Sequence, residues 1–220
     1  MRKLLDYLLI ILIGSALIIC AWLRIIPYDL TETLGFVTGA ACVYLVVRED
    51  VLNFPVGIAN NIFFFILFFR ARLFGDSGLQ LIYIVLAFHG WYLWLYGGRN
   101  QTILLVTRTS RKTLLVLALM TLLGTGALAS ILWFVRGALP LLDAATTVLS
   151  LVAQYMLNKK YFENWFVWIA ADVIYIYMYL NRSLGLTALL YLRFLFLCLG
   201  GVRSWRRSLK SRAAAISQGA

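Results

Sequence analysis

A unit of three helices occurs twice in this chain, at residues 32–94 and 143–205, with a constant offset of 111 positions and no gap. The most specific match is Asn53-x-x-Val-x-Ile-Ala against Asn164-x-x-Val-x-Ile-Ala. Other identical pairs include Tyr44/Tyr155, Gly90/Gly201 and Trp94/Trp205. An internal repeat in an apolar chain is typical of transporters that are built around a pseudo-symmetry axis.

The composition is that of a membrane protein. Hydrophobic residues make up 63% of the chain and charged residues 13%, whereas soluble domains have about 45–50% and about 25%. A spanning helix needs roughly 20 apolar residues. Eight segments are candidates, at about 4–25, 33–47, 52–70, 77–97, 113–135, 142–158, 164–181 and 184–203. The second and sixth are the weakest by hydropathy, but each is supported by its copy in the repeat. We expect the first to be a retained helix rather than a signal peptide, because its apolar run continues to Leu23.

Basic residues predict the orientation of the chain. With eight spans both termini lie on one side, which holds fourteen of the 20 Lys and Arg residues, while five lie on the other side and Arg193 falls within the last span. The positive-inside rule therefore places both termini in the cytoplasm. This bias accounts for the net charge of +11, so we do not expect nucleic-acid binding.

The repeat also predicts the architecture, an all-α integral membrane protein. Two three-helix units in direct series would run in opposite directions, and one intervening helix restores the same direction. The expected fold is one leading helix followed by 3+1+3 helices in parallel repeats. The expected parts are a leading helix in 1–30, a first repeat in 31–98, a linker with an inverting helix in 99–140, a second repeat in 141–205 and a basic cytoplasmic tail in 206–220.

Few kinds of catalytic chemistry fit these residues. The three cysteines are scattered through apolar stretches and His89 is the single histidine, so neither a metal site nor a histidine-based triad is expected. The chain has no phosphate-binding G-x-x-x-x-G-K-[ST] loop. We therefore predict that the protein is not an enzyme and binds no cofactor, with an intramembrane enzyme kept as a remote alternative.

Polar residues inside the spans form stripes at helical spacing. One stripe in the sixth span ends in Gln154 and Asn158, and the seventh span carries Trp165, Trp168, Asp172, Tyr175 and Tyr179 on one face. An Asp at the centre of a spanning helix costs about 2.5–3.5 kcal/mol. Asp172 therefore faces a polar cavity, a cation or a partner such as Arg193. A carboxylate beside aromatic faces suits a flat organic cation, and Gln154 and Asn158 suit its hydroxyl groups.

The first repeat contributes further candidate residues. Asn60 and Asn61 lie in the middle of the third span, and Gln80 and Tyr83 share a stripe on the fourth. Asn60 and Asn61 have an alternative role in helix packing, because polar residues often bond neighbouring helices. Trp91, Trp94 and Trp205 lie near span ends, where we expect them to belong to aromatic belts.

The stretches Asn53-Phe-Pro-Val-Gly-Ile-Ala-Asn-Asn61, Asp76-x-x-x-Gln80-x-x-Tyr83, Gly90-Trp-Tyr-x-Trp94 and Asn164-Trp-x-x-Trp168-x-x-x-Asp172-Val-x-Tyr175 resemble the PnuC family of vitamin transporters. The resemblance covers about residues 31–205. It implies a SWEET-like fold, a homotrimer in the bacterial inner membrane and facilitated diffusion of nicotinamide riboside for NAD biosynthesis. It also implies trapping by cytoplasmic phosphorylation. By the same resemblance Trp165 and Trp168 would clamp the ring, while Asn61, Gln80, Gln154, Asp172 and Tyr175 would supply polar contacts.

Several alternatives stay open at this point. Relatives of the family carry thiamine or riboflavin, and Asp172 would also allow coupling to protons. A receptor that binds without transport is the remaining class. We predict one site between the repeats, exposed to alternate sides by rocking of one repeat against the other.

Overall fold

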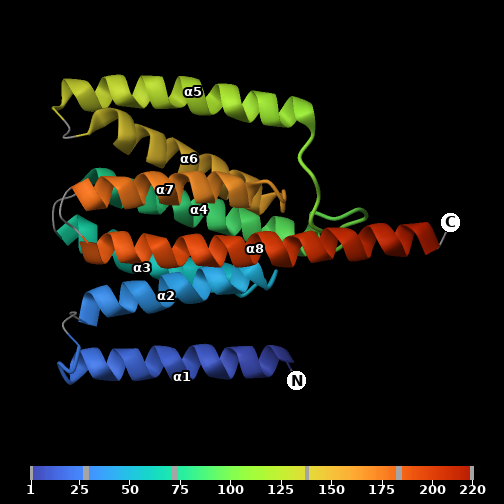
Figure 1. The fold of residues 1–220 in the computed structure, drawn as a ribbon, viewed down its shortest axis with the longest axis horizontal. Helices are drawn as coiled ribbons and strands as arrows, with labels where there is room; N and C mark the ends of the chain where they lie inside the picture. The colour runs from blue at the N-terminus through green and yellow to red at the C-terminus, as the bar shows by residue number, and fades with distance from the viewer. Residues whose placement is uncertain (1, 27–29, 71–73, 137–138, 182–184, 219–220) are drawn as a thin grey trace. The chain divides into compact units, whose positions relative to one another are not determined.

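The computed structural model describes residues 2–26, 30–70, 74–136, 139–181 and 185–218. This part of the chain forms eight helices (Figure 1) and an isolated bridge between Thr107 and Tyr161. The all-α prediction with eight helices is therefore confirmed. The helices are α1 (Arg2–Trp22), α2 (Leu30–Val47), α3 (Asn53–Arg70), α4 (Phe74–Tyr96), α5 (Arg111–Phe134), α6 (Pro140–Asn158), α7 (Asn164–Asn181) and α8 (Gly185–Gln218).

Several of these helices are candidate membrane spans. By length and composition, and counting only described residues, three segments can cross a bilayer: Ser77–Tyr96, Arg111–Phe134 and Pro140–Asn158. Shorter apolar helices run over Tyr7–Trp22, Thr33–Val47 and Asn53–Leu67.

Residues at the N-termini of α5 and α6 explain where these two helices begin. Ser110 caps α5 by accepting a hydrogen bond from the backbone N–H of Thr113 at 3.1 Å. Pro140 stands in the first turn of α6, where no backbone donor is lost.

The helix bounds reproduce the repeat. Shifted by 111 positions, the bounds of α3 are those of α7, the end of α2 is the end of α6, and the start of α4 is the start of α8. The shared offset in the sequence thus corresponds to equal lengths for α3 and α7, 18 residues each, and to equal spacing between consecutive helices in the two copies.

The turns that follow α2 and α6 are copies of each other. Glu49 and Lys160, which are 111 positions apart, have positive φ angles of 54° and 49°. Such left-handed residues commonly end helices. The next residue in each copy donates its backbone N–H to a carbonyl five positions earlier at 2.9 Å, Asp50 to Leu45 and Tyr161 to Met156.

The repeated asparagine completes each turn. The side-chain amide of Asn53 donates to the carbonyl of Asp50 at 2.6 Å, and that of Asn164 donates to the carbonyl of Tyr161 at 2.6 Å. Both asparagines are buried. The most specific motif of the repeat therefore begins with a residue that shapes the turn before a helix.

The last helix is longer than its apolar segment. We placed the last span at residues 184–203, whereas α8 continues to Gln218. Its 34 residues extend roughly 51 Å, while the hydrocarbon core of a bilayer is about 30 Å thick. The segment that we described as a basic tail is thus helical through Gln218.

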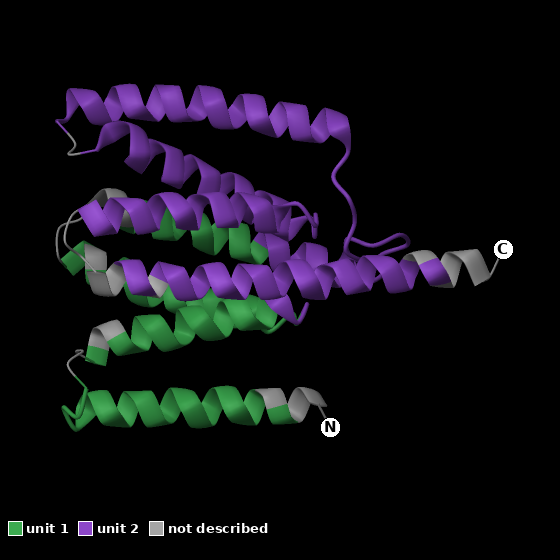
Figure 2. Cartoon of the chain, in the orientation of Figure 1, with its two compact units in different colours: residues 1–46, 50–88 green, residues 47–49, 89–220 purple. Residues whose placement is uncertain are grey.

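The chain divides into two compact units (Figure 2). Unit 1 comprises residues 1–46 and 50–88, and unit 2 comprises residues 47–49 and 89–220. In unit 1, Gly35 of α2 lies against the ring of Phe64 of α3, where a β-carbon would collide with the ring. In unit 2, α5 packs on α6, α6 on α7 and α7 on α8.

Three tryptophans form the core at one end of unit 2. Trp94, Trp165 and Trp205 are 2%, 1% and 0% exposed. The rings of Trp165 and Trp205 meet edge to face with centroids 5.3 Å apart, and those of Trp94 and Trp205 lie 6.2 Å apart. The prediction that Trp94 and Trp205 belong to an aromatic belt is therefore wrong, because both rings are enclosed by protein.

Candidate functional site

The stripe on α7 places one carboxylate in the interior of unit 2. Asp172 is 5% exposed, and its Oδ2 accepts a hydrogen bond from the thiol of Cys198 on α8 at 3.5 Å. Arg193, the alternative partner that we predicted for Asp172, is an exposed residue of α8. It lies five positions from Cys198, roughly 140° around the helix. A thiol is a weak donor, so Asp172 has its buried charge only weakly compensated by this contact.

Aromatic rings lie beside this carboxylate. Tyr175 of α7 stacks on Tyr191 of α8 with centroids 4.5 Å apart, and Tyr179 lies 5.3 Å from Tyr191. Tyr175 also lies close to Thr146 and Ser150 of α6. Trp168, four positions before Asp172, is half-buried. The sequence reasoning missed Tyr191, although the repeat pointed to it: Tyr191 stands 111 positions after Gln80.

The two tryptophans predicted to clamp a ring have different surroundings. Trp165 packs against Trp205 and against the backbone of α8 at Gly201. Its indole Nε1 and the Oδ1 of Asn164 are buried with no hydrogen-bond partner in the part of the chain that the structure describes. Trp168 lies one turn further along α7 and keeps part of its surface exposed. The role of Trp165 as a clamp stays a prediction, and its present contacts are those of a core residue.

The polar stripe on α6 adds an amide pair to unit 2. Gln154 donates from Nε2 to Oδ1 of Asn158 at 3.1 Å. Asn158 is fully buried, whereas Gln154 keeps some exposure. Gln154 is therefore the member of the pair with surface left for a ligand.

The four candidate residues of the first repeat belong to unit 1. Asn60 donates to the hydroxyl of Thr38 at 2.5 Å and to the carbonyl of Gly35 at 3.4 Å, which joins α3 to α2. This geometry favours the packing role for Asn60. Asn61, Gln80 and Tyr83 are half-buried.

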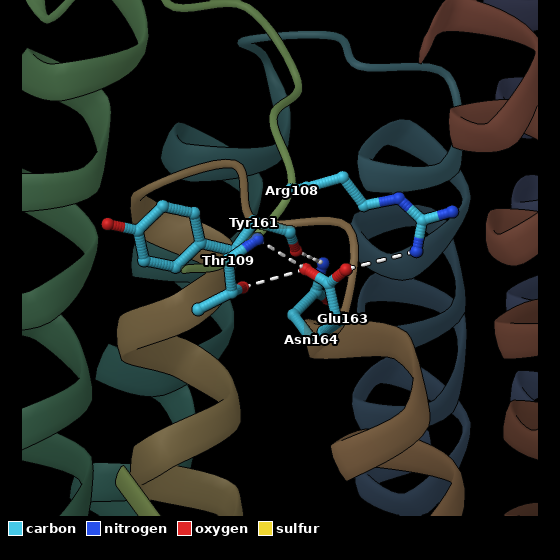
Figure 3. A network of polar contacts seen from close by, with 5 residues as sticks. All are labelled: Arg108, Thr109, Tyr161, Glu163 and Asn164. Atoms are coloured by element: carbon cyan, nitrogen blue, oxygen red, sulfur yellow. Dashed lines mark hydrogen bonds and ion pairs between the residues drawn. The ribbon is translucent and has the colours of Figure 1, made fainter. Parts of the chain in front are cut away.

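A second polar network joins the segment before α5 to the start of α7 (Figure 3). Both the backbone N–H and the hydroxyl of Thr109 donate to Oε2 of Glu163, at 2.8 and 2.7 Å, and Arg108 pairs with Oε1 at 3.1 Å. Partial burial alone would raise the pKa of Glu163, but the hydrogen bonds from Thr109 and Arg108 outweigh it and hold that pKa below its ordinary value. Residues 107–109, which belong to the expected linker, thus fix the entry to α7.

Groups that hold metal ions do not gather in the described residues. No cluster of three or more His, Cys, Asp or Glu side chains there has the geometry for a metal ion. Cys20 and Cys42 are half-buried and Cys198 is buried, and all three are free thiols.

The sequence of this chain is similar to those of known transporters. The family model described as "Nicotinamide mononucleotide transporter" matches residues 29–207. "Nicotinamide riboside transporter PnuC" of Escherichia coli (strain K12) is 25% identical over 215 residues, covering 85% of this chain and 90% of that protein. The PnuC of Neisseria mucosa is 28% identical over 197 residues, covering 84% and 74%.

Two further similarities bear on substrate and fold. "Riboflavin/roseoflavin transporter RibM" of Streptomyces davaonensis is 24% identical over 202 residues, covering 86% of this chain and 91% of that protein. The structure described as "Crystal structure of the Vitamin B3 transporter PnuC" has the same fold, with a TM-score of 0.68 and 22% identity over 93% of this chain and 90% of that one.

The resemblance that we found in the sequence is therefore confirmed, and the enzyme alternative is wrong, since the family consists of transporters. With a match over residues 29–207, this multi-pass membrane protein belongs to the nicotinamide mononucleotide transporter family and is a vitamin transporter of the PnuC type.

Proposed function

We propose that this protein carries nicotinamide riboside across the bacterial inner membrane by facilitated diffusion. The observation that carries the proposal is the buried Asp172 with Trp168 and Tyr175 on the same face of α7. Nicotinamide riboside has a flat cationic ring, which a carboxylate and aromatic faces attract together. Gln154 supplies an amide for the ribose hydroxyls, with Asn158 holding its position. Asn61, Gln80 and Tyr83 are further proposed contacts.

The mononucleotide fits the same residues less well. Its phosphate adds about two negative charges, and none of the proposed contact residues is basic. Asp172 would repel a phosphate, because like charges in a poorly hydrated site interact strongly. The riboside, which lacks the phosphate, is therefore the better match.

Other vitamins form the second group of candidates. A relative named for riboflavin is 24% identical to this chain, so riboflavin is the alternative with direct support. Riboflavin is neutral and larger, and it would leave the charge of Asp172 without a counterpart. Thiamine shares a cationic aromatic ring and is the other alternative.

The proposed transport needs no energy source of its own. The chain has no ATP-binding loop, and phosphorylation of the riboside in the cytoplasm would keep its concentration there low. Uniport then suffices for net uptake that feeds NAD synthesis. Coupling to protons through Asp172 is the alternative mechanism. We propose that both termini are cytoplasmic, as the fourteen basic residues on that side indicate, and that the protein forms a homotrimer.

The experiment is uptake of labelled riboside into proteoliposomes without ATP or an ion gradient, with the mononucleotide, thiamine and riboflavin as competitors. We expect saturable equilibration that Trp168→Ala and Asp172→Asn abolish. Trp133→Ala is the matched control, since Trp133 of α5 is 76% exposed. Flux of another vitamin in place of the riboside would identify that vitamin as the substrate. Flux only with a proton gradient would show coupling to protons in place of uniport. Binding without flux would refute transport.

A further inference from the structure

A charged pair with a buried lysine and a half-buried glutamate lies at the end of unit 2 where α6 ends and α7 begins. Nζ of Lys160 lies 3.6 Å from Oε2 of Glu49, and Lys160 is 3% exposed. The other oxygen of Glu49 accepts a hydrogen bond from Ser208 of α8 at 2.5 Å. Lys160 also lies 4.2 Å from the ring centre of Trp94, a cation–π contact. Four segments far apart in the sequence thus meet at one ion pair.

The members of this cluster are copies of each other in the repeat. Glu49 and Lys160 are 111 positions apart, and so are Trp94 and Trp205, whose rings lie 6.2 Å apart. In an object with a two-fold axis, a residue that touches its own copy lies at the axis. Two independent pairs of copies in mutual contact therefore mark the pseudo-symmetry axis at this end of the protein.

The ion pair has a small energetic margin. Burial lowers the pKa of Lys160. The nearby charge of Glu49 and its hydrogen bond raise that pKa by a smaller amount, so the pKa of the lysine stays below its ordinary value. Desolvation of a buried pair commonly offsets most of its Coulomb attraction. Separation of the two side chains into water therefore costs far less than a bare Coulomb energy would suggest.

We infer that Glu49 and Lys160 form an axial gate pair, which holds the two repeats together at this end and separates each time the transporter opens there. The inference rests on the proposed transport by rocking of the two repeats, because rocking separates residues that touch across the axis at one end. By the basic residues around it this end is cytoplasmic, so the pair controls release of the vitamin into the cell. Glu49 and Lys160 act on the conformational step and do not touch the substrate.

The test is a reversible cross-link across the pair. Glu49→Cys and Lys160→Cys are combined in a chain whose half-buried Cys20 and Cys42 are replaced and whose buried Cys198, which bonds to Asp172, is kept. The double substitution removes both charges together and leaves neither unpaired. A short bis-thiosulfonate joins the new thiols, and a reducing agent releases them. The matched control joins Arg108→Cys to Glu163→Cys, since that pair links the linker before α5 to the second repeat and does not join one repeat to the other. Riboside uptake and riboside binding are both measured.

The cross-linked protein is expected to lose at least about 10-fold in uptake, because a closed gate stops the cycle. Binding should be retained, reduction should restore uptake, and the control cross-link should leave uptake unchanged. Undiminished uptake by the cross-linked protein would overturn the inference, because a pair that never opens is no gate. Loss of binding together with uptake would overturn it as well, since the cluster would then support the site.

A charge reversal covers the case in which the cysteine pair does not transport. Glu49→Lys places two lysines at the axis, and Lys160→Glu in the same chain restores opposite charges. Uptake recovered in the double reversal relative to the single one supports the gate pair, and equal loss in both refutes it. The unmodified protein is measured alongside. Absence of riboside uptake there would refute the proposed substrate separately, and the cross-link would then be repeated with the vitamin that is carried.

Discussion

Two adjacent glycines of α8 should respond to the same substitution with opposite sign. At Gly201 a β-carbon would fall among the ring atoms of Trp165, whereas at Gly200 it would meet no heavy atom within 4 Å. Trp165 is 1% exposed and packs against Trp205, so its ring has no room to give way. Gly201→Ala is therefore expected to lower the free energy of unfolding, and Gly200→Ala to raise it.

The magnitude follows from two effects. Replacing Gly by Ala in a helix stabilises by about 0.8–1.0 kcal/mol, and both variants share this gain. Overpacking a close contact costs about 1–3 kcal/mol, and only Gly201→Ala incurs it. The difference between the variants is then the overpacking cost, which corresponds to roughly 2–12 °C in Tm at about 2–4 °C per kcal/mol.

The assay is thermal unfolding of both purified variants in the same detergent, with the unsubstituted protein beside them. Gly200→Ala should melt at or above the unsubstituted protein, and Gly201→Ala clearly below Gly200→Ala. A Tm for Gly201→Ala equal to or above that of Gly200→Ala would refute the close packing of Trp165 on α8.

Three further outcomes are expected. The pKa of Glu163 is lowered in the folded protein, so this carboxylate stabilises the fold above its unfolded pKa, and the stabilisation is lost as the pH falls below about 4. Glu163→Gln should reduce that acid-induced loss of stability in melting curves recorded from pH 7 to pH 3. An unchanged dependence of Tm on pH in the variant would contradict this. Asn164→Ala removes the hydrogen bond of the turn before α7 and should lower the free energy of unfolding by about 0.5–1.5 kcal/mol in denaturant titrations, with the affinity for the riboside retained. A loss of affinity without a loss of stability would instead make Asn164 a ligand contact. Tyr191→Ala removes the ring that stacks on Tyr175 and should weaken riboside binding in calorimetry, while Tyr191→Phe keeps the stack and should bind normally; equal weakening by both variants would assign the effect to the hydroxyl.

The repeat made much of the fold predictable from the sequence. Apolar length alone left the second and sixth spans weakly supported, yet each was supported by its copy, and α2 and α6 are both present. In the structure α3 and α7 have the same bounds at this offset, and α2 and α6 have the same end, because turn-forming residues recur at the same spacing. Asn53 and Asn164 show this directly, since each bonds to the turn that precedes its helix.

The surroundings of individual side chains were harder to predict. Hydropathy does not distinguish lipid from protein interior, so Trp94 and Trp205 read as residues of the membrane boundary although both are enclosed. The same limit applies to Lys160, which counted only as a basic loop residue and is in fact buried. Contacts of this kind depend on which segments meet in three dimensions, and spacing along one helix does not contain that information.

The axial gate pair has a consequence for how such a protein is encoded. In a dimer of identical three-helix subunits, a position that touches its own copy across the axis must present the same residue twice. Two glutamates or two lysines would then repel each other in a buried place. Glu49 opposite Lys160 therefore requires two copies that are encoded separately, as they are within this chain. Joining two subunits into one gene thus permits an attraction at the symmetry axis that no assembly of identical subunits allows.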